Sequence, residues 1–234
     1  AISDYWTQVL LLPIMDTIKD IIKEKFSNVC SVNNHAEGFN LLKEHIRKDI
    51  YSYDISSWTD NLPALLQKDM LSHIFNEEIA NAWYELVVTC EWEVKGSTER
   101  VKYGTGQGMG TNGSFDIATL TSLISLEMIY KEDYQMDLLD NSLFNEIGDD
   151  IWCYDPDQHI YHMLTKHMGM EINLSKTKHS TDENTCGEFV SRNINFGADV
   201  SRISPNICRA VKNNLLDLPE LMSHIAERNN KSDL

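Results

Sequence analysis

Three aspartates are the residues whose type and spacing most suggest chemistry. Asp54 ends the stretch "IYSYD", and Asp149 and Asp150 lie side by side after Gly148 in "LFNEIGDDIWCYD". Carboxylates that converge repel each other when ionised, unless a cation holds them together. Magnesium is bound by one or two carboxylates with substrate phosphates, and two such ions can assist phosphoryl transfer. We therefore predict a divalent-cation site, although each aspartate taken singly is also an ordinary turn or cap residue.

A glycine-rich segment, "YGTGQGMGTNGS", is the second candidate site. From Gly104 to Gly113 it could present backbone N–H groups to phosphates just before a helix begins. It matches neither the Walker A loop nor the dinucleotide-binding fingerprint. The alternative is a flexible turn in which Ser114 is the N-cap of the following helix.

The remaining polar candidates have plainer interpretations. His159, His162 and His167 share a predicted helix, where a solvated face is favoured over a metal site. Lys176 and Lys178 are surface lysines unless their surroundings give them a role. Four tryptophans are expected to serve packing rather than base stacking: Trp58, Trp83, Trp92 and Trp152.

Composition bounds the class of protein. The 234 residues allow one good core, or one core with a partial second lobe, and 42% of them are hydrophobic. A net charge of −16 argues against a general nucleic-acid binder, because neutralising phosphates requires clustered Lys and Arg. The five cysteines are dispersed without a C-x-x-C pair, which favours a reducing compartment and argues against structural zinc.

Targeting and membrane signals are not apparent in the sequence. No apolar run reaches membrane-spanning length, and no signal peptide or basic transit segment opens the chain. Because the first residue is Ala1 rather than Met, we expect a fragment or a processed product.

Helices and strands are predicted to alternate along the chain. Apolar spacing and helix-start signals predict helices over Val9–Phe26, Phe39–Lys48 and Asp157–His167, and another from Pro63 towards Val88. A further helix is predicted after Ser114, with Ile117, Leu120, Ile124 and Met128 on one face. Strands or hairpins are predicted in "IYSYDISS", in Cys90–Tyr103 with a turn at Lys95–Gly96, around Gly148, in "GMEINLSKT", and in "EFVSRNINFGADVSRIS" with a turn at Phe196–Gly197. The fold class is therefore α+β with a largely antiparallel sheet.

The order of five segments resembles the motif series A to E of viral RNA-dependent RNA polymerases. The segments are, in sequence, "YDISSWTDNLP", "GQGMGTNGSFDIATLTSLI", "IGDDI", "GMEINLSKT" and "EFVSRNINFGADVSRIS". The series is most similar to the mitovirus and narnavirus branch, which is related to the levivirus replicases. The opening "SDYWTQ" also resembles a segment common in mitovirus polymerases.

This resemblance implies roles for individual residues. Asp54, Asp149 and Asp150 would bind two Mg²⁺ or Mn²⁺ ions, with Asp149 as the essential ligand of the pair. Lys176 would be a catalytic residue that gives a proton to pyrophosphate. Asp60 would lie near the incoming ribose and help to read its 2′-OH. The other implied contacts are Thr59, Gly110 and Ser114 for the nucleotide, and Gly108, Met109 and Arg192 for template or primer.

The implied architecture is a right-hand polymerase palm with partial fingers and the start of a thumb. Residues 1–48 would be fingers-side helices, and residues 49–185 the palm, with a fingers insertion at about 75–105. Residues 186–234 would form a primer-grip-like hairpin (Glu188–Ser204), the start of the thumb and a frayed tail, "ERNNKSDL". The implied partners are template RNA, nascent RNA and ribonucleoside triphosphates, inside the host cell. The location would be the mitochondrion if the chain is mitovirus-like, and otherwise the cytoplasm.

Departures from the family pattern leave alternatives open. A Lys-x-Arg motif normally precedes the segment that resembles "SDYWTQ", and here that motif and most of the thumb are expected to be missing, so activity of the chain alone is in doubt. Ser122 stands where many mitovirus relatives have His. One alternative is a non-catalytic relic of such a polymerase. The others are a reverse transcriptase-like palm and, from another class, an acidic interaction domain in which Gly-Asp-Asp is only a turn.

Overall fold

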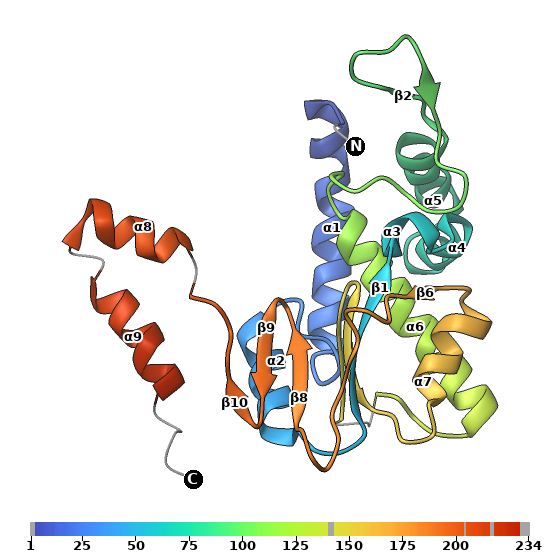
Figure 1. The fold of residues 1–234 in the computed structure, drawn as a ribbon. Helices are drawn as coiled ribbons and strands as arrows, with labels where there is room; N and C mark the ends of the chain where they lie inside the picture. The colour runs from blue at the N-terminus through green and yellow to red at the C-terminus, as the bar shows by residue number, and fades with distance from the viewer. Residues whose placement is uncertain (1–2, 140–142, 204, 216–217, 230–234) are drawn as a thin grey trace.

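The computed structural model describes residues 3–139, 143–203, 205–215 and 218–229, and its centre is an antiparallel sheet (Figure 1). Strand β1 (Ile50–Ser56) pairs with β5 (Asp150–Tyr154) along one edge. The hairpin partner of β5 is β4 (Phe144–Ile147), and β1 pairs along its other edge with β6 (Glu171–Ile172) and β7 (Lys178–His179). The strand order is β4-β5-β1-β6, with β7 also on β1. The predicted α+β class with an antiparallel sheet is confirmed.

Helices and short strands surround this sheet. The helices are α1 (Tyr5–Lys25), α2 (His35–His45), α3 (Trp58–Asn61), α4 (Ala64–Ile74), α5 (Glu77–Tyr84), α6 (Ser114–Tyr134), α7 (His159–His162), α8 (Pro205–Asn213) and α9 (Leu218–Asn229), with π-helical turns η1 (Glu85–Thr89) and η2 (Met163–His167). The other strands are β2 (Trp92–Glu93), β3 (Arg100–Val101), β8 (Cys186–Phe189), β9 (Arg192–Asn195) and β10 (Ala198–Asp199).

The sheet separates two hydrophobic cores because strand side chains alternate between its faces. Tyr53 and Ile55 of β1 enter the larger core, which contains apolar residues of α1, α4, α5 and α6. Ile50, on the opposite face, packs with Trp152 and with Phe39 of α2 in a smaller core. The larger core is therefore the platform on which the ends of β1 and β5 are held.

Strands β8, β9 and β10 form a three-stranded meander that completes the smaller core. The predicted turn at Phe196–Gly197 is confirmed as the β9–β10 connection. A second turn, at Val190–Ser191, joins β8 to β9, so the single predicted hairpin is wrong in its strand count. The reason is that Glu188 and Phe189 pair back on Arg192 and Asn193 before the chain reaches Phe196.

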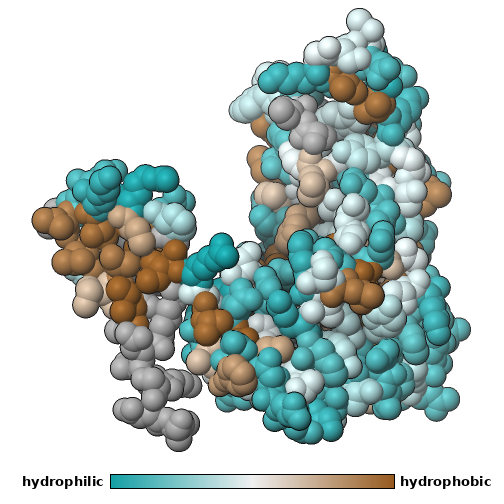
Figure 2. Space-filling view, viewed as in Figure 1, coloured by the Kyte–Doolittle hydropathy of each residue, from teal (hydrophilic) through white to brown (hydrophobic). Residues whose placement is uncertain are grey.

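Two helices near the carboxyl end lie away from the sheet (Figure 1). Helix α8 has no buried residue, and Figure 2 shows hydrophobic residues gathered on the visible face of the α8–α9 pair. The predicted frayed tail is helical as far as Asn229, and residues 230–234 lie outside the described residues.

Several predicted helices differ in detail. The helix expected from Pro63 towards Val88 is interrupted at Phe75, where the Asn76 side chain accepts a hydrogen bond from the Ile79 N–H and caps a new helix. Met128 is 64% exposed and does not share the buried face of Ile117 and Leu120, because α6 is buried almost all round only in its first half. The helix expected over Asp157–His167 begins at His159 and ends in a π-helical turn.

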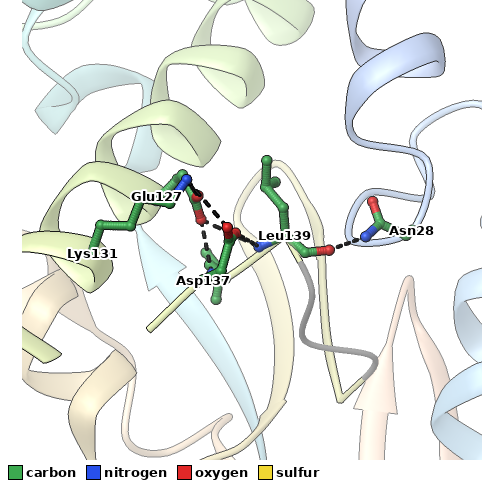
Figure 3. Close-up of polar contacts among 6 residues, drawn as sticks. Asn28, Glu127, Lys131, Asp137 and Leu139 are labelled. Carbon is green, nitrogen blue, oxygen red and sulfur yellow. Dashed lines mark hydrogen bonds and ion pairs between the residues drawn. The ribbon is translucent and has the colours of Figure 1, made fainter. Parts of the chain in front are cut away.

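A polar cluster fastens the end of α6 to the segment before β4 (Figure 3). The Glu127 carboxylate accepts hydrogen bonds from the backbone N–H groups of Leu138 and Leu139, at 2.8 and 3.2 Å, and pairs with Lys131. The Leu139 carbonyl accepts a hydrogen bond from the Asn28 side chain. These contacts hold Leu138 and Leu139 against α6 and Asn28.

Candidate active site

The predicted aspartates meet at one end of the sheet. Asp54 of β1 lies directly opposite Asp150 of β5 in the antiparallel register, so their side chains share one face. Asp149 occupies the β4–β5 turn, and its carbonyl accepts a hydrogen bond from the Ile55 N–H at 3.1 Å. Residues about 95 positions apart are thus joined by the pairing of two strands.

Gly148 permits the tight turn that exposes Asp149. Its φ of +61° lies in the left-handed region, which favours glycine. A Cβ atom at this position would lie 2.4 Å from the Phe115 ring. Phe115 in turn packs edge-on against Trp58, with ring centroids 5.8 Å apart. Glycine is therefore required here both by backbone conformation and by the aromatic side chain beneath the turn.

Partial loss of hydration and mutual repulsion raise the pKa values of both hairpin carboxyls. Loss of hydration within the surrounding protein raises the pKa of Asp150 to about 6, and the neighbouring charge of Asp149 adds to this effect. The pKa of Asp149 is also raised, first by desolvation and then by the charge of Asp54, against an opposing effect of Lys176. Such a cluster favours a positive charge at its centre.

Lys176 supplies one positive charge from a turn far along the chain. Its Nζ atom lies 3.0 Å from an Asp54 carboxylate oxygen, and its side chain is 63% exposed. Asn173 holds this turn: its carbonyl accepts hydrogen bonds from the N–H groups of Lys176 and Thr177, and its own N–H donates to the Asp54 carbonyl. The pKa of Lys176 is raised, chiefly by its hydrogen bond to Asp54.

The donor set suits divalent cations, although the carboxylates are not yet arranged around one point. Within the described ranges, no group of three or more His, Cys, Asp or Glu side chains forms a metal-holding arrangement. Oxygen ligands are nevertheless those that Mg²⁺ and Mn²⁺ prefer, and the Lys176 ammonium already lies beside Asp54 as a cation would. Because that side chain is exposed, it can move away without disturbing the core.

The segment after β1 carries Thr59 and Asp60 and contacts the glycine-rich segment. A Cβ atom on Gly106 would lie 2.0 Å from the Thr59 carbonyl oxygen, which also accepts a hydrogen bond from the Gln107 N–H at 3.0 Å. Thr59 is buried and Asp60 is exposed. The two predicted nucleotide-binding elements are therefore adjacent.

Gln107 is a buried residue at the contact between Thr59 and the glycine-rich segment. Its Nε2 atom donates to the Gln67 side chain at 2.6 Å and to the Ser114 carbonyl at 2.8 Å. Sequence reasoning missed Gln107, Gln67 and Asn173. The sequence signal that could have identified Gln107 is a large polar side chain inside a glycine-rich run. The glycines there let the backbone approach a neighbouring segment closely.

The glycine-rich segment is less open than a phosphate-binding loop. The N–H groups of Gln107, Asn112 and Ser114 already donate to acceptors within the protein. Gly113, with φ of +79°, is the N-cap residue of α6, and Ser114 is the first helical residue, so the alternative of Ser114 as the cap is wrong. The structural cause is that Ser114 is buried, with its carbonyl bound to Gln107.

The residues predicted to contact template or primer belong to two separate parts of the chain. Gly108 and Met109 belong to the glycine-rich segment, and the Met109 side chain is 63% exposed. Arg192 of β9 forms an ion pair with Asp199 at 2.7 Å and lies over the Phe39 ring at 3.8 Å. The positive charge of Arg192 is thus paired within the protein, and its contact with template or primer stays a prediction.

The other polar and aromatic residues singled out in the sequence differ in how well the structure supports their plain interpretations. Trp58, Trp83 and Trp152 are buried. His159 stacks on Tyr134 with ring centroids 4.0 Å apart, and His167 lies 3.1 Å from Asp133, so this helix face makes more contacts than a merely solvated one. Among the described residues, no helix combines the length and apolar character that crossing a membrane requires.

Comparison with known proteins agrees with this geometry. The family model for the mitovirus RNA-dependent RNA polymerase matches residues 1–232. A comparison with curated proteins finds no match.

Solved structures of telomerase share the fold. Telomerase from Candida albicans, in complex with a fragment of telomeric RNA, has a TM-score of 0.55 and 16% identity over 85% of this chain. Telomerase from Candida tropicalis, in complex with a fragment of telomeric RNA, has a TM-score of 0.56 and 15% identity over 91%. The chain spans 38% and 42% of the length of these two proteins. The likeness supports a polymerase palm as the fold.

Proposed function

Because this chain belongs to the mitovirus RNA-dependent RNA polymerase family, we propose that it forms the palm-centred part of an RNA-copying enzyme. The reaction would join a ribonucleotide to an RNA 3′-hydroxyl on an RNA template: a bond forms between the 3′-oxygen and the α-phosphorus, and pyrophosphate leaves. The observation that carries the proposal is the meeting of Asp54, the Asp149 turn and Lys176 at one end of the sheet.

Asp54 and Asp149, with Asp150 beside them, would hold two Mg²⁺ or Mn²⁺ ions. The bound ions would supply electrostatic stabilisation for the attacking and leaving oxygens. The contribution of the protein would be to hold Asp54 and Asp150 on paired strands, with Asp149 in the adjoining turn, next to a packed core.

Lys176 has two roles in this proposal. Its ammonium group balances the charge of Asp54 in the free enzyme, and this hydrogen bond raises the pKa of Lys176 further above neutral pH. When nucleotide enters, the exposed side chain can turn from Asp54 to the departing pyrophosphate and give up its proton.

Nucleotide and RNA would lie around the same end of the sheet. Asp60, which is exposed beside Gly106, would read the ribose 2′-OH, and Thr59, Gly110 and Ser114 would contribute to the nucleotide site. Template and nascent RNA would contact Gly108, Met109 and Arg192. The family affinity supports a mitochondrial location.

Primer extension on an RNA template tests this function. With Mn²⁺ or Mg²⁺ and labelled ribonucleotides, we expect Asp149→Asn to reduce incorporation by at least about 10³-fold, because charge neutralisation removes an essential ligand. The matched control is Asp182→Asn, an exposed surface aspartate that pairs with Lys48. Equal incorporation by wild type and Asp149→Asn would overturn the site.

The same assay separates the alternatives. An inactive wild-type protein that also fails to bind Mn²⁺ would support a polymerase relic. Preference for deoxyribonucleotides would support a reverse transcriptase-like enzyme.

A further inference from the structure

The opening segment "SDYWTQ" has no role in the proposed chemistry, yet its residues make specific contacts. Asp4 caps α1: its carboxylate accepts hydrogen bonds from the N–H groups of Trp6 and Thr7 at 2.9 and 3.1 Å. This cap fixes where the helix begins and therefore the direction of the side chain one turn later. That side chain is Gln8.

Gln8 binds the backbone of the glycine-rich segment with both ends of its amide. Its Nε2 atom donates to the Gly110 carbonyl at 2.8 Å, and its Oε1 atom accepts from the Asn112 N–H at 2.7 Å. The Asn112 side chain donates in return to the Gln8 carbonyl at 2.9 Å. Three hydrogen bonds thus join residues more than 100 positions apart.

The part of the segment that Gln8 holds has an unusual backbone. Gly110 has φ of +99° and Gly113 has φ of +79°, so this stretch needs external contacts to keep one conformation. Figure 1 shows the segment between β3 and α6 crossing to the amino-terminal half of α1. Its other end is fixed by Gly106 and Gln107 against Thr59.

We propose that Gln8 is a positioning residue that sets the glycine-rich segment for nucleotide binding. Held at Gly110 and Asn112 by α1, and at Gln107 by Thr59, the segment becomes a fixed bridge between the first helix and the ribose-reading turn. Only the link from the conformation of the segment to nucleotide binding rests on the proposed function. The conformation of the segment is a separate quantity that can be measured without catalysis.

Two substitutions at Gln8 separate its two hydrogen bonds. Gln8→Glu keeps an oxygen that can accept from the Asn112 N–H, but it places an oxygen instead of a donor against the Gly110 carbonyl. Gln8→Ala removes both contacts. Thr17→Ala is the matched control, because the Thr17 hydroxyl donates a hydrogen bond to the Pro13 carbonyl within α1.

Residue-resolved amide hydrogen exchange on the whole chain measures the positioning. We expect the Asn112 amide to exchange at least about tenfold faster in Gln8→Ala, to remain largely protected in Gln8→Glu, and to be unchanged in Thr17→Ala. Thermal unfolding checks that each variant is folded, and Gln8→Met, which removes both side-chain hydrogen bonds but keeps the length of the side chain, replaces Gln8→Ala if that variant is not. Unchanged Asn112 exchange in the folded variants would overturn the proposal.

Steady-state kinetics test the link to nucleotide binding. We expect Gln8→Ala to raise KM for the ribonucleotide about tenfold and to change kcat much less, with Gln8→Glu between Gln8→Ala and wild type. A fall in kcat of about tenfold with an unchanged KM would overturn the nucleotide-positioning role. If the wild type polymerises nothing, the proposed function fails, while the exchange experiment still decides whether Gln8 positions the segment.

Discussion

At the scale of single residues, the β4–β5 turn depends on contacts that polar side chains and glycine make with the core beneath. Gly148 lies over Phe115, and Glu146, two residues earlier, is fully buried on the helix-facing side of the sheet. The aspartates predicted to be catalytic are therefore held by neighbours that have no part in the proposed chemistry. Two substitutions test how much stability these neighbours contribute.

Gly148→Ala should destabilise the protein by about 2–3 kcal/mol, through steric overlap with Phe115 and a positive φ that alanine disfavours. Urea unfolding measures the change. The control is Gly104→Ala, because nothing lies within 4 Å of a Cβ atom there. Phe115→Leu in the same chain should recover part of the loss, and a purely additive double variant would argue against the overlap.

Glu146 should make stability fall as the pH rises. Burial raises its pKa to about 8 from the ordinary value of 4.5, against a smaller opposing effect of the Ser122 hydroxyl. Between these two pH values the unfolded chain loses a proton that the native protein retains, so unfolding becomes more favourable as the pH increases. The neutral analogue Glu146→Gln should therefore raise the free energy of unfolding at pH 8 by about 2–3 kcal/mol and change it little at pH 5. Parallel urea titrations at the two pH values measure this, and an equal effect at both would contradict the assignment.

At the scale of elements, the meander β8–β10 is positioned by the hairpin that it covers. The Asp150 carboxylate accepts a hydrogen bond from the Val190 N–H at 3.2 Å, and the Ser52 hydroxyl accepts one from the Glu188 N–H at 3.0 Å. The β8–β9 turn has φ of +52° at Val190 and +60° at Ser191, although branched side chains disfavour that region. The turn therefore retains strain that its packing offsets.

Replacing Val190–Ser191 by Asn-Gly should stabilise the protein by about 1 kcal/mol, because that pair favours a two-residue turn with positive φ at both positions. Thermal and urea unfolding measure the gain. Ser97→Gly, in the β2–β3 turn where the residue does not have positive φ, should give no gain. A loss of stability in the Asn-Gly variant would mean that the Val190 side chain contributes more than the turn costs.

At the scale of the whole molecule, the acidic net charge and the polymerase-like fold suggest different functions. The positions of the charged site residues in the structure reconcile the two. The net charge of −16 opposes general phosphate binding. Four side chains of the predicted site lie at one end of one sheet: Asp54, Asp149, Asp150 and Lys176. The negative charge there attracts divalent cations. The family match and the telomerase-like fold support this interpretation over an acidic interaction domain.

Motif order and local periodicity were sufficient to determine the family resemblance, the α+β class, the strand that carries Asp54 and the hairpin that carries Asp149. These features depend on a few neighbouring residues: apolar spacing, a glycine at a turn, a polar cap. The break at Asn76 also had a local signal, a cap residue followed by two glutamates, but the apolar pattern continues across it. Local chemistry of this kind can be read from a sequence.

Only the tertiary structure decided which distant groups meet. Lys176 reaches Asp54 across 122 positions, and Gln8 reaches Asn112 across 104. Each contact depends on the register of strands and on helices packing against a shared core, and a shift of one residue in a strand would turn its side chain to the other face. The identities of these residues were visible in the sequence, but their partners were set by how the whole chain packs.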